Sequence, residues 1–170
     1  MIAKPKPTKA DRTRKPKKSK PRRQVLESQL EAICKQIVFW RDGCQCVESD
    51  IDGARCGNGI QWGHFIPRKQ SNWLKYDLGN TFCQCGSHNY LHDKGAVTMS
   101  AWFAEMFGPR AIKVIDATAR AHSGGKKRTT QELEEMLVKY QALYDNRFTS
   151  SSYWDFIRNG YYGEILKENV

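Results

Sequence analysis

The 170-residue sequence has no long hydrophobic run, and no stretch of it approaches the roughly 18 apolar residues that a transmembrane helix needs. Its basic N-terminus lacks an apolar stretch after the charges, so it does not resemble a secretory signal. Internal repeats are also lacking. These absences exclude a membrane-spanning protein and favour a cytoplasmic one. The length of 170 residues predicts one ordinary domain plus appendages.

Most of the chain also lacks net charge, because the positive excess is confined to residues 1–23. This segment has eleven Lys and Arg residues and one acidic residue, Asp11, so it accounts for the whole net charge of +10. It also holds four of the six prolines and no large apolar residue after Ile2. We therefore expect a disordered basic tail, because such a segment cannot bury enough surface to offset its ordering entropy.

A flexible polycation of this kind binds polyanions by releasing their counterions, without reading sequence. Nucleic acid is favoured over a membrane surface, since the tail has no Trp, Phe or Leu to enter a bilayer interface. A solubilising tail and a targeting signal are the alternatives. The cations expected to contact nucleic acid are Lys15, Lys17, Lys18, Lys20, Arg22 and Arg23 in the tail, with Arg68 and Lys69 in the body.

Residues 24–148 are predicted to form the folded domain, and its pattern is of the α+β class. An amphipathic helix is expected over 24–40, where apolar residues recur at three- and four-residue spacing at Leu26, Leu30, Ile33 and Ile37. Short strand-like pieces follow from 44 to 85, including a strand over 60–66. Helical periodicity returns after about residue 88, and a capping box at Thr129–Glu132 opens the last helix. The aromatic residues 149–170 are expected to pack on the body.

Five of the six cysteines lie between residues 44 and 85, and a histidine follows them at position 88. Without a secretion signal, metal binding is a better interpretation of such a cluster than a disulfide framework. The C-x2-H spacing of Cys85 and His88 suits a turn that directs two ligands to one ion. The predicted tetrahedral Zn²⁺ ligands are Cys46, Cys56, Cys85 and His88, with Cys44 and Cys83 as substitutes. The alternative is that the reduced cysteines fill apolar space.

Several short motifs follow one another in a fixed order. Together they are specific enough to indicate a protein family, although none of them is specific alone. The set consists of Arg41-Asp42-Gly43-Cys44-Gln45-Cys46, Cys56-Gly57, Gln61-Trp62-Gly63-His64-Phe65, Asn80, Cys85-Gly86-Ser87-His88-Asn89 and Lys94-Gly95. This set resembles the HNH, or ββα-metal, nuclease superfamily and, within it, the phage NinG/Rap recombination-nuclease family. The resemblance covers roughly residues 37–145 and is weaker in the second half of that range.

The resemblance implies a ββα-metal core, stapled by a structural zinc and flanked by α-helices, in which a β-hairpin and the following helix hold one catalytic divalent ion. His64 matches the general base of the family. Asn80 matches the central asparagine, which fixes the loop between the two catalytic elements. Asn89 matches the final position, where a His or Asn ligates the catalytic metal.

Two positions depart from the family's pattern. Gly63 stands where many relatives have an acidic metal ligand, so Asn89, His92 or Asp93 with several waters must hold the ion. Mg²⁺ or Mn²⁺ is expected, since Mg²⁺ keeps waters and takes few protein ligands. His92 is either such a ligand or a helix-surface residue. His88 replaces the usual last cysteine, which is a mild change because imidazole and thiolate both suit zinc.

The residue types fit phosphodiester hydrolysis. A histidine with an ordinary pKa of about 6.5 can take a proton from water near neutral pH. A divalent ion can polarise the phosphate and stabilise the leaving 3′-oxygen. Arg68, four residues after His64, is either placed to contact a phosphate or a surface charge.

The resemblance therefore implies a metal-dependent DNA endonuclease of phage recombination that cuts branched DNA, such as Holliday junctions or D-loops. It would act in the host-cell cytoplasm if the protein is phage-encoded. The apolar helices beyond residue 96 are a candidate homodimer interface. Two alternatives stay open. One is an HNH nuclease that cuts duplex DNA in packaging or restriction; the other is a non-catalytic zinc module that binds nucleic acid, in which His64 and Asn89 are structural.

Overall fold

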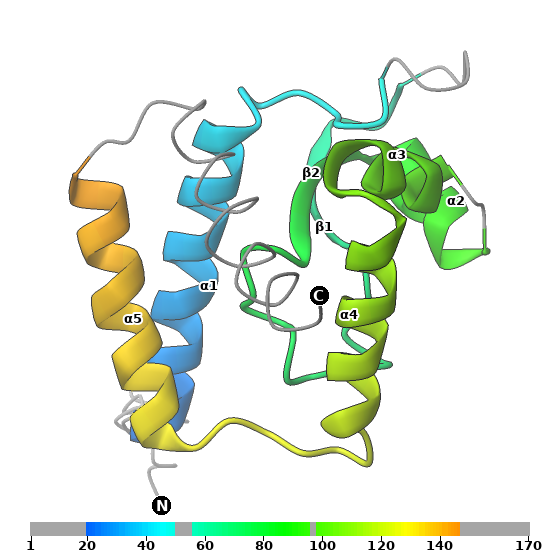
Figure 1. Ribbon diagram of the computed structural model, residues 1–170. Coiled ribbons are helices and arrows are strands. Elements are labelled where there is room, and N and C mark those ends of the chain that lie inside the picture. Colours follow the sequence, from blue (N-terminus) through cyan, green and yellow to red (C-terminus); the bar gives the residue numbers. More distant parts are fainter. Residues whose placement is uncertain (1–19, 50–55, 96–97, 147–170) are drawn as a thin grey trace, which may run out of the picture.

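The computed structural model describes residues 20–49, 56–95 and 98–146 of the chain. Within these ranges the chain forms five helices and one two-stranded antiparallel sheet, which confirms the predicted α+β class (Figure 1). The elements are α1 (Arg22–Arg41), β1 (Ile60–His64), β2 (Thr81–Cys85), α2 (Gly86–Asp93), α3 (Thr98–Phe107), α4 (Pro109–Ala121) and α5 (Thr130–Asp145). None of these helices has the length and apolar character needed to cross a membrane.

The helix α1 follows the predicted apolar stripe, but it begins inside the segment that was assigned to the tail. Arg22 forms an ion pair with Glu134 of α5, and Arg23 Nε donates to Glu27 Oε1 at 2.9 Å. The prediction that Arg22 and Arg23 belong to a disordered tail is therefore wrong, because both lie in the first turn of a helix that packs on α5. Lys20 is exposed just before the helix. The predicted cations Lys15, Lys17 and Lys18 and the predicted extension 149–170 lie outside the described residues.

The β-hairpin lies between α1 on one side and α2 and α3 on the other (Figure 1). Ile60 pairs with Cys85 and His64 pairs with Thr81, and every residue of β2 is buried. β1 ends at His64, two residues before the predicted end of the strand. It ends there because the backbone groups of Ile66 bond to the side chain of Asn80 instead of continuing the ladder.

Aromatic residues fill the space between the hairpin and the following helices. Phe82 of β2 is fully buried and meets Trp102 and Phe103 of α3 with ring centroids 4.8 and 5.9 Å apart. The helix α3 ends before Gly108, and α4 starts at once at Pro109, since proline suits the first position of a helix. The capping box of Thr129 and Glu132 forms at the start of α5, as predicted.

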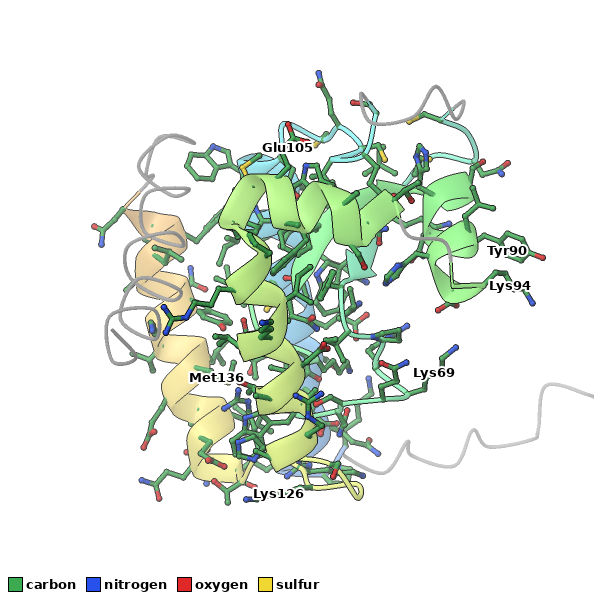
Figure 2. The ribbon with its side chains drawn as sticks, turned by 45° about the vertical axis from the view of Figure 1, so that its right-hand side comes forward. Lys69, Tyr90, Lys94, Glu105, Lys126 and Met136 are labelled. Atoms are coloured by element: carbon green, nitrogen blue, oxygen red, sulfur yellow. The ribbon has the colours of Figure 1, made fainter. Side chains whose placement is uncertain are left out.

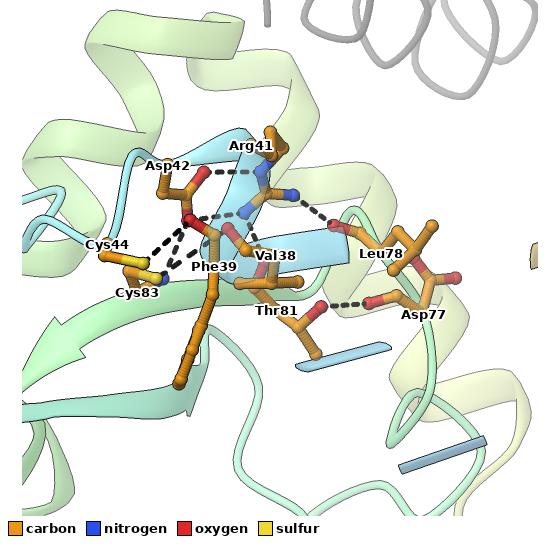
Figure 3. Close-up of polar contacts among 9 residues, drawn as sticks. All are labelled: Val38, Phe39, Arg41, Asp42, Cys44, Asp77, Leu78, Thr81 and Cys83. Carbon is orange, nitrogen blue, oxygen red and sulfur yellow. Dashed lines mark hydrogen bonds and ion pairs between the residues drawn. The ribbon is translucent and has the colours of Figure 1, made fainter. Parts of the chain in front are cut away.

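A buried ion pair joins the end of α1 to β2 (Figure 3). The side chains of Arg41 and Asp42 have no solvent exposure, and Arg41 Nη2 donates to Asp42 Oδ2 at 2.8 Å. The guanidinium also donates to the carbonyls of Leu78 and Thr81 at 2.9 and 2.7 Å. Asp42 Oδ2 accepts the backbone N–H of Cys83 at 2.7 Å. The pair therefore sets the position of β2, and with it Cys85, relative to α1.

The substitution Arg41→Met is expected to lower the free energy of unfolding by about 3–5 kcal/mol, because it leaves the Asp42 carboxylate buried without its cation. Urea denaturation followed by circular dichroism measures this change. Arg22→Met is the matched control, because its exposed pair with Glu134 should contribute less than about 1 kcal/mol. Equal losses in the two variants would contradict a special role for the buried pair.

Candidate metal centre and the adjoining pocket

Three cysteines and a histidine meet at the N-terminal end of α2. The ligand atoms of Cys46, Cys56, Cys85 and His88 all lie within 4.8 Å of one another. His88 Nδ1 is 3.2 Å from the sulfur of Cys85, 3.3 Å from that of Cys46 and 3.7 Å from that of Cys56. A tetrahedral zinc with ordinary bond lengths requires sulfur–nitrogen separations of about 3.5 Å. The cluster can therefore hold a metal such as zinc, and it consists of the four residues favoured by the sequence.

The local backbone explains how these side chains converge. Cys85 ends β2 and caps α2, where its sulfur accepts the backbone N–H of His88 at 3.4 Å. The loop before β1 is bonded to the same turn, since Gly86 N–H donates to the carbonyl of Gly59 at 2.9 Å. Gly86 itself has no room for a side chain, because a Cβ there would lie 2.7 Å from the Cβ of Asn58. The turn therefore brings Cys56 from the loop over the start of α2.

The three thiols differ in acidity. Burial raises the pKa of Cys46, and it also raises that of Cys56. Burial opposes ionisation of Cys85 as well, but the N–H groups of His88 and Gly57 outweigh it and lower the pKa of this thiol. Cys85 is thus the thiol best prepared to bind a cation, and metal binding at the cluster must displace protons from Cys46 and Cys56.

The two substitute ligands lie elsewhere. Cys44 is exposed with a φ of +55°, and its sulfur contacts the carbonyl of Phe39 at 3.5 Å. Cys83 is buried, and its sulfur contacts the carbonyl of Val38 at 3.7 Å. Figure 3 shows both sulfurs beside the Asp42 carboxylate at the end of α1. Each C-x-C pair thus contributes one member to the metal cluster and one to the contact with α1.

A pocket of about 330 Å³ lies beside the hairpin and α2. Side chains of both elements and of the loop after β1 line it, namely Trp62, His64, Pro67, Arg68, Lys69, Asn89, His92 and Asp93. The structure therefore brings His64 of the hairpin and Asn89 of the helix to one cavity, together with the two cations that follow the hairpin strand.

His64 is held in one orientation and in its neutral form. Only 7% of it is exposed, and its Nε2–H donates to the carbonyl of Lys75 at 3.0 Å. Nδ1 is therefore the nitrogen that carries the lone pair. Burial, helped by the charges of Arg68 and Lys75, lowers the pKa of His64 to about 4. The imidazole is thus unprotonated throughout the neutral range.

Asn80 does not line the pocket. It has no solvent exposure, and its amide accepts from the backbone N–H of Ile66 at 2.7 Å and donates to the carbonyls of Ile66 and Leu74 at 3.1 Å. These bonds tie together the two ends of the loop between β1 and β2. The resemblance implies that Asn80 fixes the loop between the two catalytic elements, and its burial and bonds fit such a positioning role instead of direct catalysis, because its amide cannot reach a substrate.

The predicted ligands of a second, divalent ion lie on the helix side of the pocket. Asn89 donates its amide N–H to Gln61 Oε1 at 2.8 Å, so its side-chain carbonyl oxygen is left to coordinate a cation. His92 donates Nε2–H to the carbonyl of Phe65 at 2.9 Å, and its buried Nδ1 has no partner among the described residues. A backbone carbonyl behind the ring is the usual support of a metal-binding histidine. This donor set fits a cation that keeps several waters.

Gln84 of β2 occupies the space beside Gly63, where the resemblance would place an acidic metal ligand. A Cβ at Gly63 would lie 1.8 Å from Oε1 of Gln84, whose amide N–H donates to buried Glu48 at 2.9 Å. An acidic side chain at position 63 therefore has no room while Gln84 keeps this conformation. Sequence reasoning missed both Gln84 and Gln61, which orients Asn89. The strand register could have indicated both glutamines, since Gln61 pairs with Gln84 across the hairpin.

Comparison with protein-family models gave no match, and neither did comparison with curated proteins or with solved structures. The α+β architecture and the Cys3His cluster that can hold a metal stand on the structure alone.

Proposed function

We propose that the protein is a metal-dependent DNA endonuclease of the ββα-metal (HNH) type. The observation that carries the proposal is the shared pocket, in which His64 at the end of β1 and Asn89 in α2 meet beside Arg68 and Lys69. The resemblance implies the same order, with the base on the hairpin and a metal position on the next helix. The Cys3His cluster at the junction of β2 and α2 fits the structural zinc of such a core.

Each side chain of the pocket has a role in this proposal. Nδ1 of His64 accepts a proton from the attacking water, while the carbonyl of Lys75 holds the ring through Nε2–H. Arg68 and Lys69 bind the phosphate of the scissile bond. Asn89, His92 and Asp93 would hold Mg²⁺ or Mn²⁺, which supplies positive charge beside the phosphate and the leaving oxygen. Lys69 Nζ lies 3.7 Å from Asp93 in an exposed ion pair, so a phosphate bound to Lys69 and a cation bound to Asp93 would each replace one partner of this pair.

The proposed substrate is branched DNA, such as a Holliday junction or a D-loop, and this part of the proposal rests on the resemblance alone. The test uses the purified, zinc-containing protein with Mg²⁺ or Mn²⁺ and two substrates of the same sequence, one branched and one linear. We expect cleavage that requires the added ion and is faster on the branched substrate. Equal rates on the two substrates would favour a nuclease for ordinary duplex DNA.

A second candidate function is a non-catalytic zinc module that binds nucleic acid. The observation that favours it is the burial of His64 and its bond to a backbone carbonyl, which is also how a structural histidine is held. The same assay separates the two functions. Protein that contains zinc and binds DNA, but cleaves neither substrate with either ion, would support the binding module.

A further inference from the structure

A second, smaller pocket lies where the first turns of α1 and α5 meet the loop between β1 and β2. Its volume is about 170 Å³, and it is lined by Arg23, Glu27, Asn72, Lys75, Tyr76, Lys127, Arg128 and Leu133. Four of these side chains are cationic and one is anionic. We refer to it as the helix-end pocket. Its volume is below the roughly 300 Å³ of typical small-molecule sites, so it suits one small charged group.

Both arginines of the pocket, Arg23 and Arg128, are held by contacts with the protein. The guanidinium of Arg128 lies 4.3 Å from the centre of the Trp73 ring, and its Nε donates to the carbonyl of Trp73 at 3.1 Å. Arg23 Nη1 donates to the carbonyl of Arg128 at 2.9 Å, and its Nε bonds to Glu27. These contacts bring α1, α5 and the loop together, so the pocket exists before any ligand binds.

The cations of the pocket are only partly neutralised. Glu27 pairs with Arg23, and Glu31 lies 3.6 Å from Lys75 Nζ, which also donates to the hydroxyl of Tyr76 at 2.9 Å. Lys127 is exposed, and no hydrogen bond or ion pair holds it among the described residues. Lys127 and Arg128 thus keep their positive charge for an anionic ligand.

Lys75 connects the helix-end pocket to His64, which lines the other pocket. The carbonyl of Lys75 accepts from Nε2 of His64, while the side chain of Lys75 lines the helix-end pocket. Lys126 is a further cation near the helix-end pocket. Its Nζ lies 5.5 Å from the centre of the Trp73 ring, which Arg128 also contacts. Figure 2 shows Lys126 at one end of the molecule and Lys69, which lines the His64 pocket, between that end and α2. The cations near the two pockets therefore come from two loops: Lys69 and Lys75 lie between β1 and β2, and Lys126 and Lys127 lie between α4 and α5.

We propose that the helix-end pocket binds a backbone phosphate of DNA at a distance from the bond that is cut. The proposal rests on DNA as the partner, as in the proposed function, but not on cleavage. Charge complementarity supports it, because each duplex phosphate is an anion that Lys and Arg neutralise with release of counterions. The chain also enters α1 beside this pocket, and residues 1–19 add eight further Lys and Arg residues. A phosphate bound there would hold the duplex at a second point, separate from the His64 pocket.

The test is the substitution Lys127→Glu, with Lys113→Glu on the exposed face of α4 as the control of equal charge change. Fluorescence anisotropy of a labelled duplex, without added divalent ions, measures affinity over a range of salt concentrations. We expect Lys127→Glu to weaken binding by roughly tenfold and to reduce the slope of log K against log salt by about 1. Lys113→Glu should leave both nearly unchanged.

Equal effects of the two substitutions would overturn the proposal, since the loss would then reflect overall charge. Vesicles of phosphatidylserine provide the second arm of the experiment. If Lys127→Glu impairs vesicle binding but not duplex binding, the pocket belongs to a membrane surface and the proposal fails. Both lysines are exposed, so the melting temperatures of the variants should equal that of the wild type. Because binding is measured without cleavage, a protein that fails to cut DNA would still test this pocket.

Discussion

Replacing His64 by alanine is expected to lower kcat/KM for DNA cleavage by about 10²–10⁴-fold, the usual contribution of a general base. The loss follows from the position of His64 in the pocket with Arg68 and Asn89, where Nδ1 is the only unprotonated ring nitrogen. Rates of cleavage with Mg²⁺ or Mn²⁺ at subsaturating substrate measure the effect. Binding of DNA in the absence of these ions should change little.

The variant His64→Gln separates catalysis from structure. Its amide can still donate to the carbonyl of Lys75, but it cannot accept a proton at neutral pH. We expect it to keep the wild-type melting temperature and to be as inactive as His64→Ala. Full activity of His64→Gln would remove His64 from the mechanism and favour the binding module.

The dependence of kcat/KM on pH gives an independent check of the same residue. A general base must be unprotonated, so activity is lost as the pH falls through its pKa in the free enzyme. Because burial lowers the pKa of His64 to about 4, the acid limb should lie near pH 4 instead of near the ordinary value of 6.5. A midpoint near pH 6.5 would show that another group, or a more exposed imidazole, takes the proton.

Replacing Cys85 by serine is expected to reduce bound zinc from one ion per chain to almost none. Cys85 is the thiol with the lowered pKa, and it also caps α2, so its loss removes both a ligand and a helix cap. We expect the free energy of unfolding to fall by at least about 4 kcal/mol, which corresponds to roughly 15 °C in melting temperature for a domain of this size. Metal analysis of the purified protein and thermal denaturation measure the two changes.

Cys44→Ser is the matched control, because Cys44, like Cys85, belongs to a C-x-C pair, but its sulfur contacts the carbonyl of Phe39 instead of the metal cluster. It should retain one zinc per chain and nearly all of its stability. Loss of zinc from Cys44→Ser, with normal zinc in Cys85→Ser, would show that the ligand set is assigned wrongly.

Local patterns were sufficient to predict much of this architecture. The apolar stripe of α1 and the capping box of α5 are short-range signals, since they depend on residues three or four positions apart. Cys85 and His88 could also be chosen from spacing, because a C-x2-H turn presents both side chains to one point. The sequence favoured Cys46 and Cys56 as the other two ligands but left Cys44 and Cys83 as substitutes, and the structure brings Cys46 and Cys56 into the cluster. The end of β1 could not be predicted, since it depends on Asn80, which lies fourteen residues beyond Ile66.

Sequence by itself determined the class of the fold, the basic N-terminal segment and the residue types available for chemistry, because these follow from composition and short spacing. Only the tertiary structure decided that Arg23 lines a pocket instead of belonging to a flexible tail, and that Gln84 fills the space beside Gly63. It also decided that His64 is buried and neutral whereas Asn80 is enclosed. The physical reason is common to all four: contacts with residues far along the chain set the burial, the charge and the orientation of each side chain.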